Sequence, residues 1–384
     1  MCGSKLTIVS FDFADTKIVC FFVPTKFIVI MIAALDVQVT KALKSRLSEI
    51  DFDNLSFGKV FTDHMLEVDY ADGEWKKVTI RPFQSLSLSP ALAAIHYGQS
   101  IFEGIKAYKD REGNPFIFRP FDNFRRFNIS AERMNMPVVP EEIFIEGMRR
   151  LVEMDKEWIP MKNDYSLYIR PFMFACDEVI GVKSSDTYKF MILLSPTGPY
   201  YSAPMRIYVE EKYTRAARGG FGFAKAAGNY GGSMLATAIA KQQGYDQVLW
   251  TDAFEHKYVQ EIGTMNVFFV IGDKVLTPDL EAGTILEGVT RDSAIEVLRE
   301  EGYTVEECPI NIDDVIRAWQ AGELKEVFGT GTAATISMIK ELKYEDFSIK
   351  FDTENWTVAP TVKRVLTDIR EGRRKDTRGW MFSV

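Results

Sequence analysis

The segment GGFGFAKAAGNYGGS, residues 219–233, combines six glycines with a single lysine, Lys225. Small residues flank this lysine, Ala224 before it and Ala226 and Ala227 after it, and no acid adjoins it. This context suits an ε-amine that a ligand must reach and whose pKa is lowered by desolvation. A lone lysine is usually a surface cation, however, so the segment by itself leaves both interpretations open.

Two further glycine-containing turns follow, in LEGVTRDSAIEVL (286–298) and in EVFGTGTAATI (326–336). Glycines let backbone N–H groups approach an anion, and a helix N-terminus adds roughly half a positive charge, so converging turns would bind phosphate and carboxylate. Each glycine could instead serve only its own turn. Gly329–Ala334 also matches a G-x-G-x-x-A dinucleotide fingerprint with Asp352 beyond it, but the short polar stretch between them argues against a βαβ unit.

The rest of the pattern mixes strands and helices, which predicts an α/β (mixed α+β) fold. KVFTDHMLEVDY (59–70) and WKKVTIRPF (75–83) flank an Asp-Gly turn and predict a β-hairpin. Apolar spacing and stop signals predict four helices, at Phe121–Met134, Glu141–Glu157, Ser233–Gln243 and Arg291–Glu301. The stretch from Ser195 to Pro204 has three prolines and a glycine, so we expect an N-terminal domain over 36–197, a linker at 198–204 and a C-terminal domain over 205–384.

Composition excludes several classes of protein. The chain has 384 residues, 46% of them apolar and 26% charged, and a net charge of −8, which argues against a partner with a phosphate backbone. Its four cysteines and three histidines do not stand at metal-ligand or CxxC spacing, so no metal site is predicted. A reduced, cytoplasmic compartment is the simplest expectation.

Residues 1–35 form an apolar extension that we expect to lie outside the fold. Ile18–Leu35 is apolar, but Pro24 and Lys26 interrupt it, which makes it marginal as a membrane span. It also has features of a signal peptide, with Lys17 ahead of it and small residues near its end. Our interpretation is that translation starts at Met31 and that the extension is neither a membrane span nor a signal peptide. The alternative is a membrane-anchored form of the protein.

The ordered set of motifs along residues 50–384 resembles the class IV aminotransferases, and within them the branched-chain amino acid aminotransferases. In the second half the motifs are KAAGNYG (225–231), EIGTMNVF (261–268), LEGVTR (286–291) and FGTGTAA (328–334). In the first half they are FGKVFTDHM (57–65), HYxxxxFEG (96–104), FRPxxNxxR (118–126) and SLYIRP (166–171). The resemblance implies a two-domain type IV pyridoxal-phosphate fold, with a smaller N-terminal α/β domain and a larger C-terminal pseudo-barrel domain.

By this resemblance, Lys225 forms the Schiff base with pyridoxal 5'-phosphate and later moves a proton between the substrate Cα and the cofactor. Glu261 matches the acid that pairs with the ring nitrogen. Tyr230 matches the residue that hydrogen-bonds the phenolate oxygen. The other implied cofactor-binding positions are Arg126, Gly288, Val289, Thr290 and Thr332. Without the resemblance, Glu261 is a surface acid and Arg126 one of a basic pair on a helix.

The resemblance also implies a substrate site. The turn at Thr332 and Ala333 would hold the α-carboxylate, and Arg170 would help the distal carboxylate of the second substrate. An apolar pocket would come from Phe57, Phe102, Tyr168 and Thr264. Tyr97 and the loop Ile180-Gly181-Val182 would reach in from the partner subunit of a homodimer. Each aromatic residue could equally be ordinary core.

The implied reaction is transamination of leucine, isoleucine and valine with 2-oxoglutarate, giving branched-chain 2-oxo acids and L-glutamate. We expect no nucleic acid and no membrane as partner. Alternatives within the family are a D-amino-acid aminotransferase and an aminodeoxychorismate lyase; outside it, a non-catalytic phosphate-binding protein. The sequence departs from some members at Ala334 and Ser337, which replace a CxxC pair, and at Glu287, an acid that the sequence does not explain beside a phosphate site.

Overall fold

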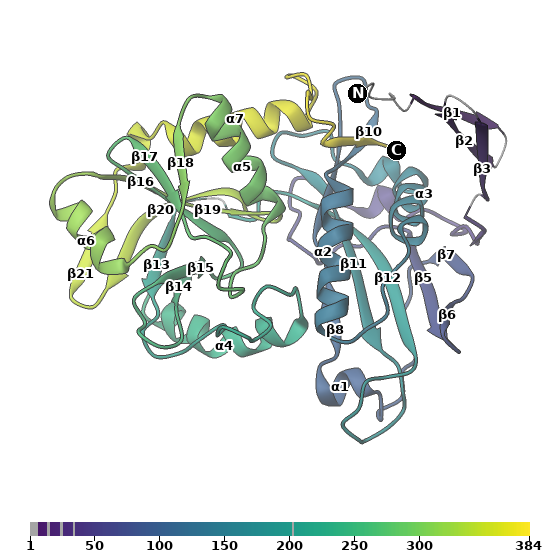
Figure 1. Cartoon of the computed structure of the whole chain (residues 1–384), viewed down its shortest axis with the longest axis horizontal. Helices are drawn as coiled ribbons and strands as arrows, with labels where there is room; N and C mark the ends of the chain where they lie inside the picture. The colour runs from purple at the N-terminus through teal and green to yellow at the C-terminus, as the bar shows by residue number, and fades with distance from the viewer. Residues whose placement is uncertain (1–6, 14–15, 24–25, 34, 202) are drawn as a thin grey trace.

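The computed structural model describes residues 7–13, 16–23, 26–33, 35–201 and 203–384. Its strands form three sheets, and helices pack on the two large ones, as Figure 1 shows. This confirms the predicted mixed α/β class. No helix in the described ranges is both long and apolar enough to cross a membrane.

The first large sheet has ten strands in the order β22-β10-β9-β11-β12-β5-β7-β4, with β6 paired to β5 and β8 to β11. Its pairs are antiparallel except for β4 with β7. The strands are β4 (Val37–Val39), β5 (His64–Ala71), β6 (Glu74–Trp75), β7 (Val78–Pro82), β8 (Ser100–Phe102), β9 (Ile105–Lys109), β10 (Pro115–Phe118), β11 (Ser166–Ala175), β12 (Tyr188–Thr197) and β22 (Met381–Ser383).

The second large sheet has nine strands in the order β15-β14-β13-β20-β19-β16-β17-β18, with β21 paired to β20. It mixes parallel pairs, such as β13 with β14 and with β20, and antiparallel pairs, such as β19 with β20. The strands are β13 (Met205–Val209), β14 (Gln247–Thr251), β15 (Val259–Ile262), β16 (Asn266–Ile271), β17 (Lys274–Thr277), β18 (Thr304–Glu307), β19 (Leu324–Gly331), β20 (Thr335–Tyr344) and β21 (Phe347–Lys350).

The helices lie against the faces of the two large sheets. They are α1 (Ala93–Tyr97), α2 (Pro120–Arg133), α3 (Gly147–Met154), α4 (Ala227–Gln242), α5 (Val289–Glu300), α6 (Ile312–Gln320) and α7 (Val358–Arg370). A π-helical turn, Glu142–Glu146, precedes α3, and short 3₁₀ turns occupy Leu47–Glu49, Lys156–Trp158 and Thr353–Asn355. In Figure 1, α2 runs along the junction between the two sheets.

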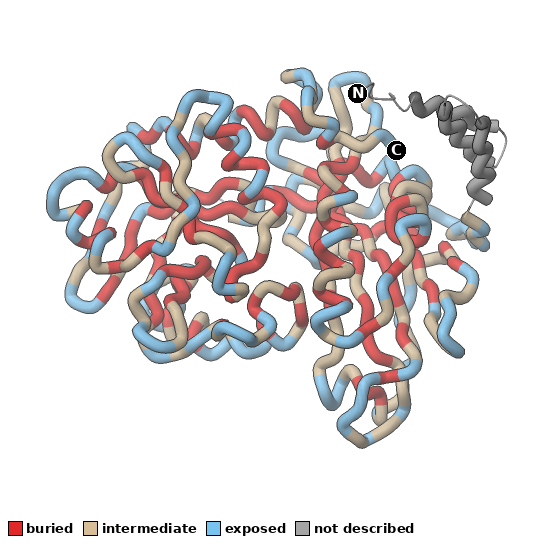
Figure 2. The backbone as a smooth tube through the Cα atoms, viewed as in Figure 1, coloured by how far each residue is buried: buried red, intermediate tan, exposed pale blue. Residues whose placement is uncertain are grey.

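Apolar cores fill both faces of the nine-stranded sheet and the helix-covered face of the ten-stranded sheet. Figure 2 shows the buried backbone running through the strands while the connecting loops are exposed. One core joins the two sheets, because Phe118 at the end of β10 and Trp380 just before β22 pack with residues of α5 and α7. The space between the sheets is therefore set by apolar packing as well as by the connecting chain.

The predicted elements agree with the structure in type and differ at several boundaries. The hairpin at 64–82 and the helix predicted at Phe121–Met134 are confirmed. The helix predicted to start at Ser233 starts six residues earlier, at Ala227, and therefore includes three glycines of low helix propensity. The helix predicted at Glu141–Glu157 is broken into π, α and 3₁₀ turns.

The dinucleotide fingerprint has the wrong structural context. Gly329–Ala334 joins two antiparallel strands, with Gly331 opposite Thr335, and no helix follows the glycines. A dinucleotide-binding turn leads from a strand into a helix. The match is therefore coincidental.

The predicted extension and linker remain predictions. In the described part of the extension, β1 (Thr7–Phe13), β2 (Thr16–Val23) and β3 (Lys26–Ala33) form a three-stranded antiparallel sheet of their own. Leu35, the last residue of the predicted extension, packs against the core of the first large sheet, and the remaining residues of the extension lie outside the described ranges. The chain passes from the first large sheet to the second between Thr197 and Met205, and its last strand, β22, returns to the first sheet.

Candidate active site

The main chain at Lys225 is held from both halves of the molecule. Its carbonyl accepts a bond from the Phe102 N–H, and its own N–H donates to Ser130 Oγ at 2.9 Å. Asn229, in the first turn of α4, donates its side-chain amide to the Ala224 carbonyl at 2.9 Å. The glycine-rich segment is therefore a fixed turn, and the lysine that it carries has a defined position between the two sheets.

The side chain of Lys225 points into a cavity of about 300 Å³ between the sheets. Its Nζ donates to the Tyr230 hydroxyl at 2.9 Å, and it lies 5.0 Å from the centre of the Phe102 ring. The surface-cation interpretation is wrong, because the side chain is partly buried and faces aromatic rings. The cavity is lined by thirteen of the predicted positions: Phe57, Phe102, Arg126, Tyr168, Arg170, Lys225, Tyr230, Thr264, Gly288, Val289, Thr290, Thr332 and Ala333.

One end of the cavity is a site for an anion. Helix α5 begins at Val289, so the N–H groups of Val289 and Thr290 lack partners within the helix. Gly288 allows the backbone to pass close to the Asn266 side chain, because a Cβ at this position would lie only 2.0 Å from Asn266 Oδ1. Arg126, which is 4% exposed, lines the same end. Backbone donors at a helix N-terminus together with a guanidinium are well suited to a phosphate group.

Glu103 holds Arg126 in place. Arg126 Nε and Nη2 donate to the two Glu103 oxygens at 2.8 Å each, and its Nη1 donates to the Glu287 carbonyl at 2.8 Å. A guanidinium has five N–H donors, so these three bonds leave two for a ligand. Burial raises the pKa of Glu103, but the Arg126 charge and hydrogen bonds outweigh it, and the pKa lies below its ordinary value. Glu103 is therefore an ionised partner of Arg126.

Glu261 lies fully buried beside the cavity. Its carboxylate contacts Arg215 Nε at 2.9 Å and accepts the Leu286 N–H at 3.1 Å. Burial raises the pKa of Glu261 above its ordinary value, while Arg215, the Leu286 N–H and Lys225 act in the opposite direction. The interpretation of Glu261 as a surface acid is wrong. A buried acid with a fixed cationic partner is suited to face a positively charged ring nitrogen.

The opposite end of the cavity is aromatic with one cation. Phe57 and Tyr168 pack edge to face at 4.8 Å, and Arg170 donates to the Tyr168 hydroxyl at 2.9 Å. The Arg170 guanidinium lies 4.6 Å from the centre of the Phe102 ring, and its buried Nε has no hydrogen-bond partner among the described residues. This end can take an apolar side chain and retains a donor for a carboxylate.

The structure accounts for Glu287. Its carboxylate pairs with Arg125 at 2.8 Å, and only its backbone carbonyl contacts Arg126. The Arg125 side chain lies at the surface, 54% exposed, so the extra negative charge is neutralised away from the anion site.

Apart from Glu261, which lies beside the cavity, three predicted residues do not line it. Tyr97, at the end of α1, and Ile180 and Val182, in the loop between β11 and β12, are 39%, 75% and 90% exposed. Their role in the partner subunit's site stays a prediction.

Sequence reasoning missed several residues of the site. Glu103 and Asn266 stand inside the quoted motifs but received no role, and Arg215 and Tyr200 stand outside all of them. Local sequence patterns do not reveal such residues, because their contacts are with residues far away in the sequence. Arg215 contacts Glu261, and Asn266 donates to the Leu286 carbonyl at 2.9 Å. Tyr200 reaches the cavity from the predicted linker.

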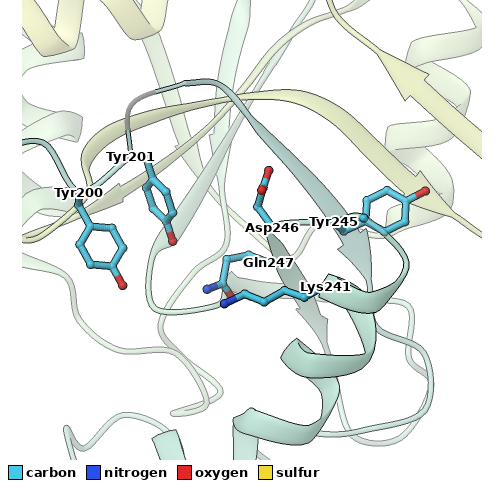
Figure 3. Close-up of a pocket in the computed structure, with 7 residues that line it drawn as sticks. Tyr200, Tyr201, Lys241, Tyr245, Asp246 and Gln247 are labelled. Atoms are coloured by element: carbon cyan, nitrogen blue, oxygen red, sulfur yellow. The ribbon is translucent and has the colours of Figure 1, made fainter. Parts of the chain in front are cut away.

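A larger cavity of about 510 Å³ is also lined by Tyr200, together with Tyr201 of the same linker (Figure 3). Lys241 extends from α4 toward Gln247 on β14, with Tyr200 and Tyr201 facing them. Burial raises the pKa of Tyr201 to about 12, so its phenol stays protonated. None of the predicted site residues lines this cavity, and neither the N-terminus of α5 nor Lys225 reaches it. The chemistry is therefore concentrated in the cavity that holds Lys225.

The comparisons with known proteins agree with this geometry. Residues 100–342 match the family described as amino-transferase class IV. A probable branched-chain-amino-acid aminotransferase of Staphylococcus aureus (strain MRSA252) is 47% identical over 360 residues, 92% of this chain and 99% of the relative.

Solved structures give the same result. The branched-chain amino acid aminotransferase of Escherichia coli superposes with a TM-score of 0.69 at 25% identity, over 84% of this chain and 99% of that one. The branched-chain aminotransferase of the thermophilic archaeon Thermoproteus uzoniensis, solved with norvaline, gives 0.68 at 25% identity, over 83% and 99%. The predicted type IV fold is thereby confirmed, and the chain belongs to the branched-chain-amino-acid aminotransferases of the class IV aminotransferase family.

Proposed function

We propose that the chain transfers the amino group of L-leucine, L-isoleucine or L-valine to 2-oxoglutarate, with pyridoxal 5'-phosphate held covalently by Lys225. The observation that carries this proposal is the placement of the Lys225 amine 2.9 Å from the Tyr230 hydroxyl, in one cavity with the N-terminus of α5 and Arg126. When bound, pyridoxal phosphate supplies an electron-accepting ring that stabilises negative charge at the substrate Cα.

The residues of the cavity fit this cofactor at each of its polar groups. Arg126 and the N–H groups of Val289 and Thr290 would bind the phosphate. Glu261 would pair with the ring nitrogen, and Tyr230 would donate to the phenolate oxygen. The fit rests on the unpaired donors at the start of α5, the two remaining N–H groups of Arg126 and the buried carboxylate of Glu261.

Lys225 would also move the proton. When its amine is not bonded to the cofactor, Lys225 would accept the proton from the substrate Cα and deliver it to C4′ of the cofactor. The Tyr230 hydroxyl keeps this amine oriented by the bond at 2.9 Å. General-base catalysis by a positioned side chain contributes about 10²–10⁴-fold to such a step.

Substrate choice follows from the two ends of the cavity. The aromatic end, with Phe57, Phe102 and Tyr168, would accept a branched apolar side chain, and the turn at Thr332 and Ala333 would bind the α-carboxylate. Arg170, with a spare donor in that aromatic surrounding, would bind the distal carboxylate of glutamate and 2-oxoglutarate. An apolar wall discriminates by only about 1–3 kcal/mol per methylene, so we expect all three branched substrates to react.

We infer that the working form is a homodimer. Tyr97, Ile180 and Val182 are exposed, and so is Ile95 on the same helix as Tyr97, at 63%, although large apolar side chains are usually buried. In a homodimer the partner subunit would cover these side chains, and they would complete the partner subunit's active site. Sedimentation analysis tests the assembly, and Ile180→Asp should both weaken it and raise the KM for leucine.

The test of the function is the absorption spectrum of the purified protein incubated with pyridoxal phosphate. We expect a yellow cofactor band that bleaches with L-leucine, returns with 2-oxoglutarate and does not respond to D-alanine. Borohydride treatment of the yellow form should attach the cofactor irreversibly to the peptide that contains Lys225, as mass spectrometry would report.

Lys225→Ala is the matched variant. We expect it to keep the fold, by circular dichroism, and to lose transamination by at least about 10³-fold, because it lacks both the anchoring amine and the base. A wild-type protein that stays colourless, or a variant with appreciable turnover, would contradict the proposal.

A further inference from the structure

The turn between β19 and β20 carries backbone strain. Thr335 has a φ of 58°, and a β-branched residue in this left-handed region is an outlier. The turn runs from Gly331 to Thr335 and presents Thr332 and Ala333 to the cavity that holds Lys225. Strained backbone persists only where the surrounding structure holds it.

Lys106 holds this turn from the other sheet. It lies on β9 and is 6% exposed, and its Nζ donates to the Ala333 carbonyl at 3.2 Å, across 227 residues of sequence. This is its only side-chain hydrogen bond within the described ranges. Lys106 stands opposite Tyr168 in the register of β9 and β11, so both side chains project from the same face of the ten-stranded sheet.

Lys106 does not reach the substrate cavity itself. It lines a separate space of only about 10 Å³, with Thr290, Thr332 and Arg370, while the cavity around Lys225 lies on the other side of Thr332. A space of this size holds at most one water molecule, so it is too small for an organic ligand. The lysine therefore contacts the turn from behind.

We propose that Lys106 is a positioning residue, which sets the affinity for the substrate carboxylate by fixing the peptide between Ala333 and Ala334. The proposal rests on the proposed function, in which this turn binds that carboxylate. A planar trans peptide points its carbonyl and its N–H in opposite directions. While Lys106 holds the Ala333 carbonyl, the Ala334 N–H is directed away from Lys106, and the turn keeps one orientation.

The charged groups that face Lys106 do not hold the turn in its place. Arg370 opposes its positive charge and Asp164 favours it, while neither forms a salt bridge with it among the described residues. A lysine amine keeps N–H donors in both protonation states, so the bond to the Ala333 carbonyl survives titration. The turn therefore depends on the hydrogen bond from Lys106 and not on the positive charge of its amine.

The experiment compares the holoenzymes of wild type, Lys106→Met, Lys106→Arg and Lys109→Met. Lys109 is a control on the same strand, where it faces Glu157 at 3.5 Å and not the turn. The probes are 4-methylvaleric acid, which has the leucine side chain and a carboxylate, and 4-methyl-1-pentanol, which has the side chain alone. Dissociation constants come from the change in the cofactor band or from inhibition of leucine turnover.

We expect Lys106→Met to weaken binding of the acid about tenfold, the equivalent of one hydrogen bond, and binding of the alcohol less than about twofold. The KM for leucine should rise by a similar factor with little change in kcat, because the base is untouched. Lys106→Arg, which keeps a donor, should restore binding to within about threefold, and Lys109→Met should match wild type. If the methionine variant does not fold, Lys106→Leu, which also lacks a donor, serves in its place.

Three results would overturn the inference alone. The first is acid binding by Lys106→Met as tight as in wild type. The second is an equal loss for acid and alcohol, which would indicate general collapse of the pocket, and the third is a wild-type holoenzyme that turns over leucine but does not bind the acid. A wild type that neither binds pyridoxal phosphate nor transaminates would instead reject the proposed function on which the inference rests.

Discussion

At the scale of single residues, the site depends on charges that are buried and paired. Arg126 and Glu103 form a two-pronged ion pair that is almost inaccessible to solvent, with side chains 5% and 0% exposed. Removing one partner of such a pair leaves an uncompensated buried charge, which costs about 3–5 kcal/mol. The same geometry occurs in Arg81 and Glu67, where both side chains are 18% exposed and water screens the charges more.

Glu103→Gln should therefore lower the free energy of unfolding by about 3–5 kcal/mol, whereas Glu67→Gln should cost on the order of 1 kcal/mol. Urea denaturation of the cofactor-free protein at neutral pH measures both. Equal losses in the two variants would show that burial does not set the energy of the pair. Pyridoxal phosphate should recover part of the loss in Glu103→Gln only, since its phosphate gives Arg126 a new partner.

Lys106 gives the stability a pH dependence. Burial, together with the Arg370 charge, lowers the pKa of Lys106 to about 7. In the unfolded chain its pKa is ordinary, near 10.4, so between these values the unfolded state binds the extra proton and stability rises with pH.

Lys106→Met removes this titration. The stability of the variant relative to wild type should therefore be greater at pH 7 than at pH 9, by on the order of 2 kcal/mol. The lost bond to the Ala333 carbonyl adds an offset that is the same at both values. Denaturation of the two proteins at each pH measures the difference, and a constant gap would mean that Lys106 titrates normally.

At the scale of elements, α7 has an unusual cap. Its N-cap residue, Thr357, makes no side-chain capping bond. Instead Glu326 on β19 accepts the N–H groups of Thr357, Val358 and Ala359, at 2.7, 2.9 and 2.8 Å. A carboxylate at this end also complements the positive end of the helix dipole. The helix that covers one face of the nine-stranded sheet is thus anchored to a strand of that sheet.

Glu326→Ala should lower the free energy of unfolding by about 3 kcal/mol, because three N–H groups, two of them buried, lose a charged acceptor. Glu323→Ala, which removes an exposed carboxylate just before the same strand, should cost less than about 0.5 kcal/mol. Thermal denaturation followed by circular dichroism compares the two, and similar melting temperatures would contradict the capping role.

At the scale of the whole molecule, the C-terminus joins the two sheets. Strand β22 pairs with β10, and the Arg119 N–H donates to the Trp380 carbonyl just before it. Arg119, held at a φ of 49°, lies over the Trp380 ring at 5.1 Å and contacts Asp292 of α5 at 2.7 Å. The orientation of the two sheets, and with it the width of the active-site cavity, depends on this junction.

Trp380→Ala should cost about 3–5 kcal/mol of stability, because a ring that is 7% exposed leaves a cavity between the sheets. It should also raise the KM for leucine, since the residues of the site come from both sides of the junction. Trp319→Ala, at a half-buried position on α6, is the control and should change stability less and the KM not at all. Loss of stability with an unchanged KM in Trp380→Ala would mean that the junction does not position the site.

The sequence by itself determined the local features and the family. Lys225 in its glycine-rich turn, the start of α5 after Gly288 and the ordered motifs are patterns of neighbouring residues, and such patterns are read directly from the chain. They predicted the mixed α/β class and thirteen residues that line one cavity. They misplaced the start of α4, because its first turn includes three glycines of low helix propensity and is fixed by the Asn229 side chain, which donates to the Phe221 and Ala224 carbonyls.

Only the tertiary structure decided which distant residues meet. Glu103 with Arg126, Arg215 with Glu261, Lys106 with Ala333 and Glu326 with the start of α7 are pairs separated by 23 to 227 residues. A buried charge is tolerated only where a partner lies within hydrogen-bond reach. The sequence shows which residues are charged but not which of them lie close together. Those distances are set by how the two sheets pack.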